Sequence, residues 1–340
     1  MKAFQLIKKG DSNQAFKLTD LNLADPKTGE VQIEVEAFGL NYADVMARQG
    51  LYRDAPPMPC VIGYEVVGKV CRVGDENNKD LIGSRVLAFT RFGGYSQLVN
   101  TSVLAITQIE NMDAGVALSL ATQYVTAYYM CEYLLNIHQE DKVLVHSAAG
   151  GVGTALIQLL KLKGAYVIAK TGSDEKIDYL NEQGADLVIN YRKKEYQEEV
   201  LKFTNNEKID VSFNPVAGST FKKDLSILSS GGRIVLFGGS ERSGKKWGVF
   251  STLNFLRKMG LVIPVGLMMG SKNILGVNML KIADNKPLVL QKCMQELIKL
   301  AKDNQISPHV GASFKSEELA KAHDLLESGK SIGKIIVLWK

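Results

Sequence analysis

The sequence predicts an α/β protein in which a doubly wound parallel sheet of the Rossmann type is inserted into an irregular antiparallel β-barrel. Three observations support this fold class. Short apolar runs alternate with helix-like segments through the middle of the chain, and a glycine-rich turn joins the first run to the first helix. The flanking segments instead hold short β-prone runs separated by glycine, proline and charged turns, which is typical of antiparallel sheets.

The parallel sheet begins with the apolar run at residues 143–145, which predicts a buried strand. The turn at residues 148–153 reads AAGGVG, with Ala148 in place of the first glycine of the G-x-G-x-x-G dinucleotide fingerprint, and a helical pattern follows as far as Gly164. Small residues let backbone N–H groups approach a pyrophosphate, and the helix start adds unpaired donors. A glycine string alone is more typical of an ordinary loop, so the prediction depends on its context. The predicted phosphate-binding residues are Ala148, Gly150, Gly151, Val152 and Gly153.

Further strands and helices follow this turn at short spacing. Such alternation predicts parallel strands joined by right-handed crossovers. The expected strands are residues 166–170, 186–190, 210–213 and 233–237, and the expected helices are residues 174–183, 194–203 and 220–228.

The flanking segments predict the second domain. A helix at residues 113–135 is expected to lead into the parallel sheet, residues 273–278 to be its last strand, and a closing strand at 333–338 to rejoin the first segment. The predicted boundaries are residues 1–125 and 279–340 for the barrel domain and 126–278 for the nucleotide-binding domain. The other elements expected in the barrel domain are strands at 31–37, 66–73, 85–89 and 95–99 and helices at 288–302 and 316–327.

The composition of the 340 residues, 46% hydrophobic and 23% charged, is that of a soluble globular protein. A net charge of +5 is too small to indicate nucleic-acid binding. The N-terminus lacks an apolar run of signal-peptide length, and the four cysteines are scattered without paired spacing, so we expect reduced thiols and a cytoplasmic protein. The four histidines fit no short metal-ligand spacing and are expected to be solvated or satisfied.

Several motifs of the chain are specific when they are taken together. They are GLNYADVMARQGLY, GYEVVG, the tyrosines of residues 124–128, KVLVHSAAGGVG, residues 186–191, ISPHV and Gly333-Lys334. On these residues the chain resembles the medium-chain dehydrogenase/reductases, in the zinc-free quinone oxidoreductase branch, and closest to the subgroup similar to the synaptic vesicle amine transport protein. The resemblance covers essentially the full length and implies a GroES-like catalytic domain around the Rossmann domain.

Metal binding is not expected. Zinc-using members of this family place a cysteine near residue 41 and a histidine in a Gly-His-Glu triplet. Here Asn41 stands near the first position and Tyr64 replaces the histidine, and both are poor zinc ligands. The four-cysteine structural zinc lobe is also missing. Without a Lewis acid, the chemistry expected is hydride delivery from a reduced nicotinamide to a quinone or an activated C=C bond.

The residue near the end of the second strand favours NADPH over NADH. An acidic residue about 20 positions after the glycine turn usually binds the ribose 2′-hydroxyl of NAD. That count from Gly150 reaches Lys170, whose charge suits a 2′-phosphate, although a solvated surface lysine is the alternative. By resemblance, Lys176 and Tyr191 match positions that grip this phosphate in NADPH-using relatives. The other cofactor-binding residues that the comparison implies are Thr126, Ser173, Phe237, Gly238, Asn278 and Lys334.

The resemblance places Asn41, Tyr52 and Tyr64 near the nicotinamide as candidate catalytic residues. Asn41 and Tyr64 are expected to hydrogen-bond a carbonyl oxygen that gains charge as hydride arrives, and Tyr52 to do the same or to donate a proton. Each tyrosine alone would more often be a packed core residue. Two departures from the family pattern weaken the inference that the protein acts on standard quinones. Met46 replaces an aromatic, and Asn214 replaces the usual aspartate of a D-P-V-G-G-like turn.

Two functions are therefore considered. The first is a cytoplasmic, zinc-independent, NADPH-dependent reductase of quinones or α,β-unsaturated carbonyl compounds, acting as a homodimer that pairs the last strands of its parallel sheets. The alternative is an NADPH-binding, membrane-associated or regulatory protein with little turnover. Its support is the apolar stretch at residues 250–269, which is interrupted by Arg257, Lys258 and Pro264 and so cannot span a bilayer, although it could lie on a surface.

Overall fold

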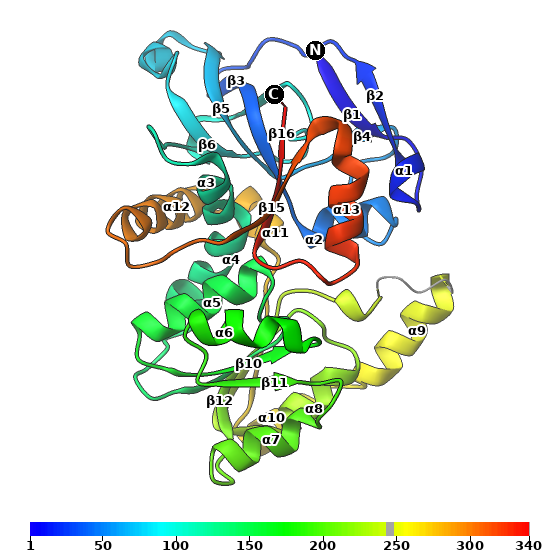
Figure 1. Ribbon diagram of the computed structural model, residues 1–340, viewed down its shortest axis with the longest axis vertical. Coiled ribbons are helices and arrows are strands. Elements are labelled where there is room, and N and C mark those ends of the chain that lie inside the picture. Colours follow the sequence, from blue (N-terminus) through cyan, green and yellow to red (C-terminus); the bar gives the residue numbers. More distant parts are fainter. Residues whose placement is uncertain (243–247, 340) are drawn as a thin grey trace. The chain divides into compact units, whose positions relative to one another are not determined.

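The structure, a computed structural model, describes residues 1–242 and 248–339. The chain forms two compact units, which are described separately (Figure 1). The first unit comprises Met1–Thr126 and Leu280–Lys340, and the second comprises Ala127–Met279.

The first unit contains a largely antiparallel seven-stranded sheet of order β15-β16-β3-β5-β6-β8, with β7 pairing to β3. The C-terminal strand β16 pairs antiparallel with β3, so the tail of the chain completes the sheet begun by the N-terminal segment. A smaller sheet has the order β2-β1-β4. The strands are β1 (Lys2–Leu6), β2 (Phe16–Asp20), β3 (Glu30–Leu40), β4 (Cys60–Val61), β5 (Glu65–Val73), β6 (Arg85–Phe89), β7 (Leu98–Ser102), β8 (Ile106–Gln108), β15 (Val310–Lys315) and β16 (Lys334–Leu338).

Alternating apolar residues of these strands form the core of the first unit. Val31, Ile33 and Val35 of β3 point inward on one face, and Phe38, Val66 and Tyr95 are also buried there. The helices of this unit are α1 (Ser12–Ala15), α2 (Tyr42–Arg48), α3 (Ala114–Ser119), α11 (Met279–Asn285, which begins at the unit boundary), α12 (Pro287–Lys302) and α13 (Leu319–Glu327).

The helix predicted at residues 113–135 is not continuous. Asp113 caps α3 by accepting from the Val116 N–H at 2.9 Å, but wide helical turns follow at Leu120–Tyr124 and Tyr129–Leu134 on either side of α4 (Val125–Tyr128). Ala121 has a ψ of −112°, outside the helical region, so the segment bends there.

The second unit confirms the predicted doubly wound parallel sheet. Its strand order, β11-β10-β9-β12-β13-β14, is that of the Rossmann fold, and Figure 1 shows α5 and α6 on one face and α7 and α8 on the other. The strands are β9 (Lys142–Val145), β10 (Tyr166–Thr171), β11 (Leu187–Asn190), β12 (Ile209–Asn214), β13 (Leu228–Leu236) and β14 (Asn273–Gly276). The helices are α5 (Gly151–Leu162), α6 (Ile177–Glu182), α7 (Tyr196–Phe203), α8 (Ser219–Ile227), α9 (Gly248–Met259) and α10 (Pro264–Gly270).

Candidate functional site

The glycine turn after β9 fits a phosphate. Helix α5 begins at Gly151 after the N-cap Gly150, and no side chain caps it, so its first N–H groups are left for a ligand. A Cβ at Gly153 would overlap the backbone of Ala148, which shows how closely the turn packs on the helix start. The Ala148 N–H also donates to the Lys170 carbonyl at 3.1 Å, which ties the turn to the end of β10.

The end of β10 and the residue after β11 form a second part of the site. A Cβ at Gly172 would lie 2.8 Å from the Tyr191 hydroxyl oxygen, so glycine there allows the phenol to sit over the strand end. Tyr191 is 48% exposed, whereas Lys176 is only 9% exposed. Burial lowers the pKa of Lys176, and Glu175 acts in the opposite direction. Ser173 precedes the short helical turn that contains Lys176. A hydroxyl, a phenol and an ammonium group therefore lie at the strand end where a Rossmann fold binds the ribose.

Lys170 is oriented inward. Its side chain is 5% exposed, and its Nζ lies 3.2 Å from His146 Nδ1 and 3.8 Å from the centroid of the Tyr196 ring. The same Nζ lies 4.9 Å from the centroid of the Tyr191 ring. Lys170 is therefore not the solvated surface lysine that the sequence left open, and its binding role stays a prediction.

The turns after β12 and β13 lie close together. A Cβ at Gly238 would lie 2.7 Å from the Pro215 carbonyl oxygen, and the Phe237 N–H donates to the Asn214 carbonyl at 3.4 Å. The structure gives a physical reason for an asparagine at position 214, where the resemblance leads one to expect an aspartate. Its amide donates to Asp224 at 2.6 Å, where a second carboxylate would repel the first.

In the first unit, Asn41 belongs to a buried polar network that precedes α2. Its Nδ2 donates to Glu65 Oε1 at 2.8 Å, and its Oδ1 accepts from Lys334 Nζ at 3.2 Å. Lys334 forms an ion pair with Glu65, and both side chains have no exposed surface. The second Glu65 oxygen accepts from the Thr122 N–H at 2.8 Å. The Asn41 amide is thus fixed in orientation and keeps one N–H beyond the one given to Glu65.

Lys334 and Thr126, both predicted to bind the cofactor, make hydrogen bonds to other residues of the first unit. Lys334 Nζ also donates to the Leu40 carbonyl at 3.3 Å, and the Thr126 hydroxyl donates to the Thr122 carbonyl at 2.5 Å. Their cofactor roles, like that of Asn278 in the second unit, stay predictions.

The two candidate catalytic tyrosines lie side by side. Their ring centroids are 6.2 Å apart and the rings meet edge-on, while Tyr64 also packs against Phe92. Burial, followed by the charge of Asp44, raises the pKa of Tyr64 far above its ordinary value. The two phenols influence each other's ionisation, but no hydrogen bond of ordinary geometry joins them, and the Tyr64 hydroxyl has no partner among the described residues. Tyr64 is therefore a protonated, unengaged donor at neutral pH.

Asp44 is a polar residue whose role the sequence did not predict. Its Oδ2 accepts from the Asn41 N–H at 2.8 Å, and its Oδ1 has no hydrogen bond in the part of the chain that the structure describes. Burial raises its pKa from 3.8 to about 8. The signal that could have found it is the Asn-x-x-Asp spacing of a helix start.

Glu65, His146 and Asp224 were also missed as members of polar networks. Glu65 follows Tyr64 in a motif that the sequence analysis did quote, but its pairing with Lys334 spans 269 positions and has no local signal. His146 and Asp224 are both buried, and their nitrogen and oxygen atoms are 2.9 Å apart. Satisfied burial was one of the two alternatives expected for the histidines.

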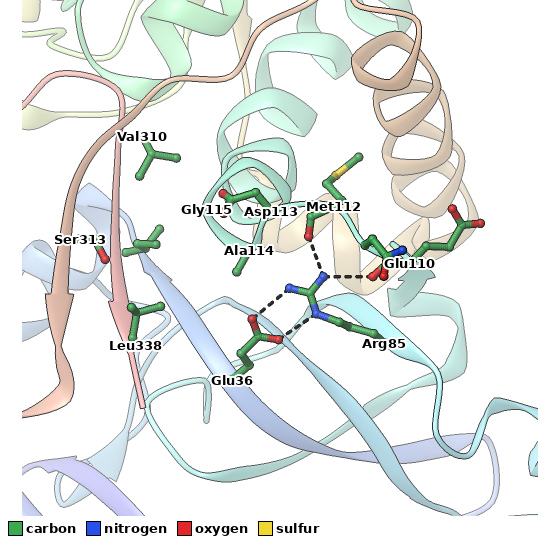
Figure 2. A pocket seen from close by; sticks show the side chains of 12 residues that line it. Glu36, Arg85, Glu110, Met112, Asp113, Ala114, Gly115, Val310, Ser313 and Leu338 are labelled. Atoms are coloured by element: carbon green, nitrogen blue, oxygen red, sulfur yellow. Dashed lines mark hydrogen bonds and ion pairs between the residues drawn. The ribbon is translucent and has the colours of Figure 1, made fainter. Parts of the chain in front are cut away.

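A hollow of about 670 Å³ opens in the first unit away from these residues (Figure 2). Arg85 is its most prominent polar side chain. Glu36 binds Arg85 through two hydrogen bonds of 2.8 and 3.0 Å, and the Glu110 and Met112 carbonyls accept two more. Arg85 therefore makes four hydrogen bonds to Glu36 and to the two carbonyl groups.

Comparisons with known proteins agree with this fold. Residues 27–130 match the family described as alcohol dehydrogenase GroES-like domain, and residues 151–303 match the family described as zinc-binding dehydrogenase. The chain is 30% identical to the synaptic vesicle membrane protein VAT-1 homolog-like of Mus musculus over 341 residues, which is 99% of this chain and 81% of that protein. It is also 30% identical to the VAT-1 homolog of Danio rerio, over 92% of this chain but only 64% of that protein's length.

A solved structure of Escherichia coli quinone oxidoreductase complexed with NADPH is similar to this chain, with a TM-score of 0.87 and 26% identity. The similarity covers 99% of this chain and all of the other.

Zinc, which the second family's description implies, does not fit the residues present. The Asn41 amide is committed to Glu65 and Lys334, and the phenol of Tyr64 is held protonated. Among the described residues, no three histidine, cysteine or acidic side chains converge as metal ligands.

Proposed function

Since this chain belongs to the medium-chain dehydrogenase/reductase superfamily, close to VAT-1 homologues and to quinone oxidoreductase structures, we propose that it is a zinc-independent, NADPH-dependent reductase. Its proposed substrates are quinones or α,β-unsaturated carbonyl compounds. The observation that supports this most is the combination, in the second unit, of an uncapped glycine turn with a hydroxyl, a phenol and an ammonium group at the adjacent strand end.

The proposed cofactor contacts follow from these groups. The N–H groups at the start of α5, at residues 151–153, would hold the pyrophosphate. Ser173, Lys176 and Tyr191 would hold the 2′-phosphate, because a cation and hydroxyl donors match its charge and acceptor oxygens. Bound NADPH supplies a hydride, and the protein has to orient it and exclude water.

On the substrate side, Asn41 and Tyr64 are proposed to stabilise a carbonyl oxygen that becomes negative during hydride transfer. Glu65 and Lys334 fix the Asn41 amide, which removes the reorganisation that a free amide would need. Tyr64 supports the proposal because its hydroxyl is protonated and has no hydrogen-bond partner in the part of the chain that the structure describes. Tyr52 packs edge-on against Tyr64 and is proposed to shape the substrate-binding position beside it.

We also propose that the protein is a cytoplasmic homodimer paired through β14. This strand ends the sheet, so one row of its N–H and C=O groups faces outward. The neighbouring α10 and the segment before it carry exposed apolar residues, including Leu261 at 87%, Met268 at 79% and Met269 at 85% exposure. A second copy would cover both features at once.

The same apolar residues favour the second candidate function, an NADPH-binding protein on a membrane surface with little turnover. Within the described residues no single helix is both long and apolar enough to cross a bilayer, and the pair at residues 251–259 and 264–270 meets that test only when joined across a bend of 41°. Arg257 and Lys258 lie on this pair. Lys258 forms an ion pair with Glu241, so Arg257 is the residue that would favour anionic lipid.

One experiment separates the two candidates. NADPH oxidation is followed with a panel of quinones and enones, and co-sedimentation with vesicles containing anionic lipid is measured on the same preparation. Turnover without vesicle binding supports the reductase. Tight NADPH binding with vesicle association and no turnover on any member of the panel supports the alternative.

A further inference from the structure

A chain of three buried side chains lies beneath the carboxyl end of the parallel sheet. Asp224 Oδ1 of α8 accepts from His146 Nε2 at 3.1 Å, and His146 Nδ1 lies 3.2 Å from Lys170 Nζ. We call Asp224, His146 and Lys170 the Lys170 relay. Asp224 and His146 are at most 1% exposed and Lys170 is 5% exposed.

The hydrogen bonds determine the protonation state of each member. Burial alone would raise the pKa of Asp224, but His146 and the surrounding donors outweigh it and hold the pKa below its usual value. Burial lowers the pKa of His146, so the ring is neutral at pH 7. Its Nε2 must carry the proton given to the carboxylate, which leaves Nδ1 as the acceptor for the Lys170 ammonium. The other donors to Asp224 are Tyr196 at 2.7 Å, Ser212 at 2.8 Å and Asn214 at 2.6 Å.

The Lys170 end of the relay lies against Tyr191, one of the residues proposed to hold the 2′-phosphate. Lys170 Nζ faces the Tyr191 ring, and the Tyr191 hydroxyl lies over Gly172 at the strand end. The Lys170 carbonyl also accepts from the Ala148 N–H of the glycine turn. The buried Lys170 ammonium thus packs against Tyr191, whose side chain is 48% exposed.

The other charges around Lys170 nearly cancel. Lys223 of α8 and Glu195 before α7 form an ion pair with each other at 2.7 Å. Asp224 is the remaining full charge that faces Lys170, and Tyr191, Tyr196 and His146 are neutral neighbours. The protonated Lys170 therefore balances Asp224, and loss of its proton leaves a net negative charge beneath Tyr191.

We propose that the Lys170 relay selects a 2′-phosphorylated dinucleotide at a distance: it keeps a positive charge under Tyr191 and holds that ring in place, without contacting the phosphate. This inference rests on the proposed NADPH binding. Lys170, His146 and Asp224 are positioning residues in this account.

The relay predicts a dependence on pH. Burial lowers the pKa of Lys170 from 10.5 to about 8. Loss of the ammonium proton as the pH rises through that value removes the positive charge, so the preference for NADPH over NADH should fall between pH 7 and 9.5.

Dissociation constants for NADPH and NADH, measured by fluorescence titration of the apoprotein from pH 6.5 to 9.5, test the proposal. Lys170→Met should weaken NADPH binding at pH 7 by at least about fivefold, as expected for loss of one charge at short range in a protein, and change NADH binding less than about twofold. Its preference should also depend less on pH than that of the unmutated protein, and Lys176, whose pKa burial also lowers, accounts for what remains. Lys170→Arg, which stays charged, should keep the preference up to pH 9.5.

Lys202→Met is the matched control, because Lys202 lies in the last turn of α7, at the opposite edge of the sheet. It should leave both dissociation constants and their pH dependence unchanged. Thermal unfolding of each variant shows whether it is folded.

Two failures are distinguishable. If the unmutated protein binds neither dinucleotide, the proposed function fails. If it prefers NADPH but Lys170→Met keeps that preference and its pH dependence, the relay inference is wrong while the reductase proposal stands. Should Lys170→Met not fold, the unmutated protein decides alone, because a preference that does not change from pH 7 to 9.5 contradicts the relay.

Discussion

The two proposed hydrogen-bond donors, Asn41 and Tyr64, differ in the hydrogen bonds that they already make inside the protein. Asn41 holds Glu65 with one N–H and accepts from Lys334, so its amide is both a possible catalytic donor and part of a buried network. The Tyr64 hydroxyl has no hydrogen bond among the described residues. At the residue scale, Tyr64 therefore gives the cleaner test of catalysis, since its removal breaks no internal hydrogen bond.

Tyr64→Phe should lower kcat by about 10²-fold, because it removes a donor used mainly in the transition state. The dissociation constant for NADPH should hardly change. Asn41→Ala should lower kcat similarly and also reduce stability, since it leaves Glu65 and Lys334 with one partner fewer. Steady-state kinetics with a quinone or enone and thermal unfolding measure both effects. Tyr52→Phe is the comparison, and a kcat for Tyr64→Phe equal to that of Tyr52→Phe and of the unmutated protein would reduce Tyr64 to a packing role.

Asp44 predicts a pH dependence of stability. Its pKa is raised to about 8 in the folded protein from 3.8, so the folded state holds a proton that the unfolded state releases above about pH 4. Its contribution to stability is present below that pH and is lost as the pH rises towards 8. Asp44→Asn keeps an oxygen for the Asn41 N–H and removes the titration. The free energy of unfolding should therefore fall less between pH 5 and 8 in the variant than in the unmutated protein, as measured by urea denaturation, and parallel curves would contradict this.

Residue types were easier to predict from the sequence than residue partners. Asn41 and Tyr64 stand in motifs, and Asp44 stands at the spacing of a helix start. The ion pair between Glu65 and Lys334 joins β5 to β16, and only the antiparallel pairing of both strands with β3 brings these two residues together. No local pattern carries that information.

At the scale of elements, the alternation of strands and helices was enough to predict the parallel sheet, because each strand and helix has its own apolar period. The direction of the Lys170 side chain was not predictable in the same way. Counting from the glycine turn reaches the correct strand end, but both faces of β10 are buried, so burial alone does not tell which helices surround Lys170. Its contact with Tyr196 of α7 is known only from the folded structure. The bend at Ala121 was likewise not predictable, because the segment Leu120–Tyr124 contains no glycine or proline.

The glycine turn gives the prediction at this scale. Gly153→Ala would push a methyl group into the backbone of Ala148, which cannot move without displacing the turn. We expect a loss of about 1–3 kcal/mol of stability from overpacking and a clear loss of NADPH affinity. Gly266→Ala, in α10, meets no atom within 4 Å and is the control. Calorimetry and NADPH titration measure the two effects, and a Gly153→Ala protein as stable and as tightly binding as the control would contradict the close approach.

At the scale of the whole molecule, a single chain leaves the outer edge of β14 at the end of its sheet and leaves apolar side chains of α9 and α10 exposed. Val277 donates its N–H to Leu236, and N–H groups alternate in direction along a strand, so the Ile274 N–H faces away from β13. This strand edge and the apolar surface beside it are where a second copy would add most contact.

Ile274→Pro should therefore shift the protein from dimer to monomer, since it removes an outward N–H without removing one from the β13 ladder. Analytical ultracentrifugation measures the mass against the 37.3 kDa of one chain. An unmutated protein that sediments as one chain at every concentration would refute the dimer. In that case, vesicle binding by the α9–α10 surface becomes the explanation to test.

The central claim is that a hydride passes from NADPH to an electron-poor carbon without zinc. The most direct test uses NADPH that carries deuterium at both C4 positions of the nicotinamide, with an enone as acceptor and a chelator present throughout, and detects deuterium in the product by mass spectrometry. The account predicts one deuterium at the β-carbon of the reduced product, with one NADPH consumed per product. A product without deuterium, or tight NADPH binding with no product from any enone or quinone, would contradict it.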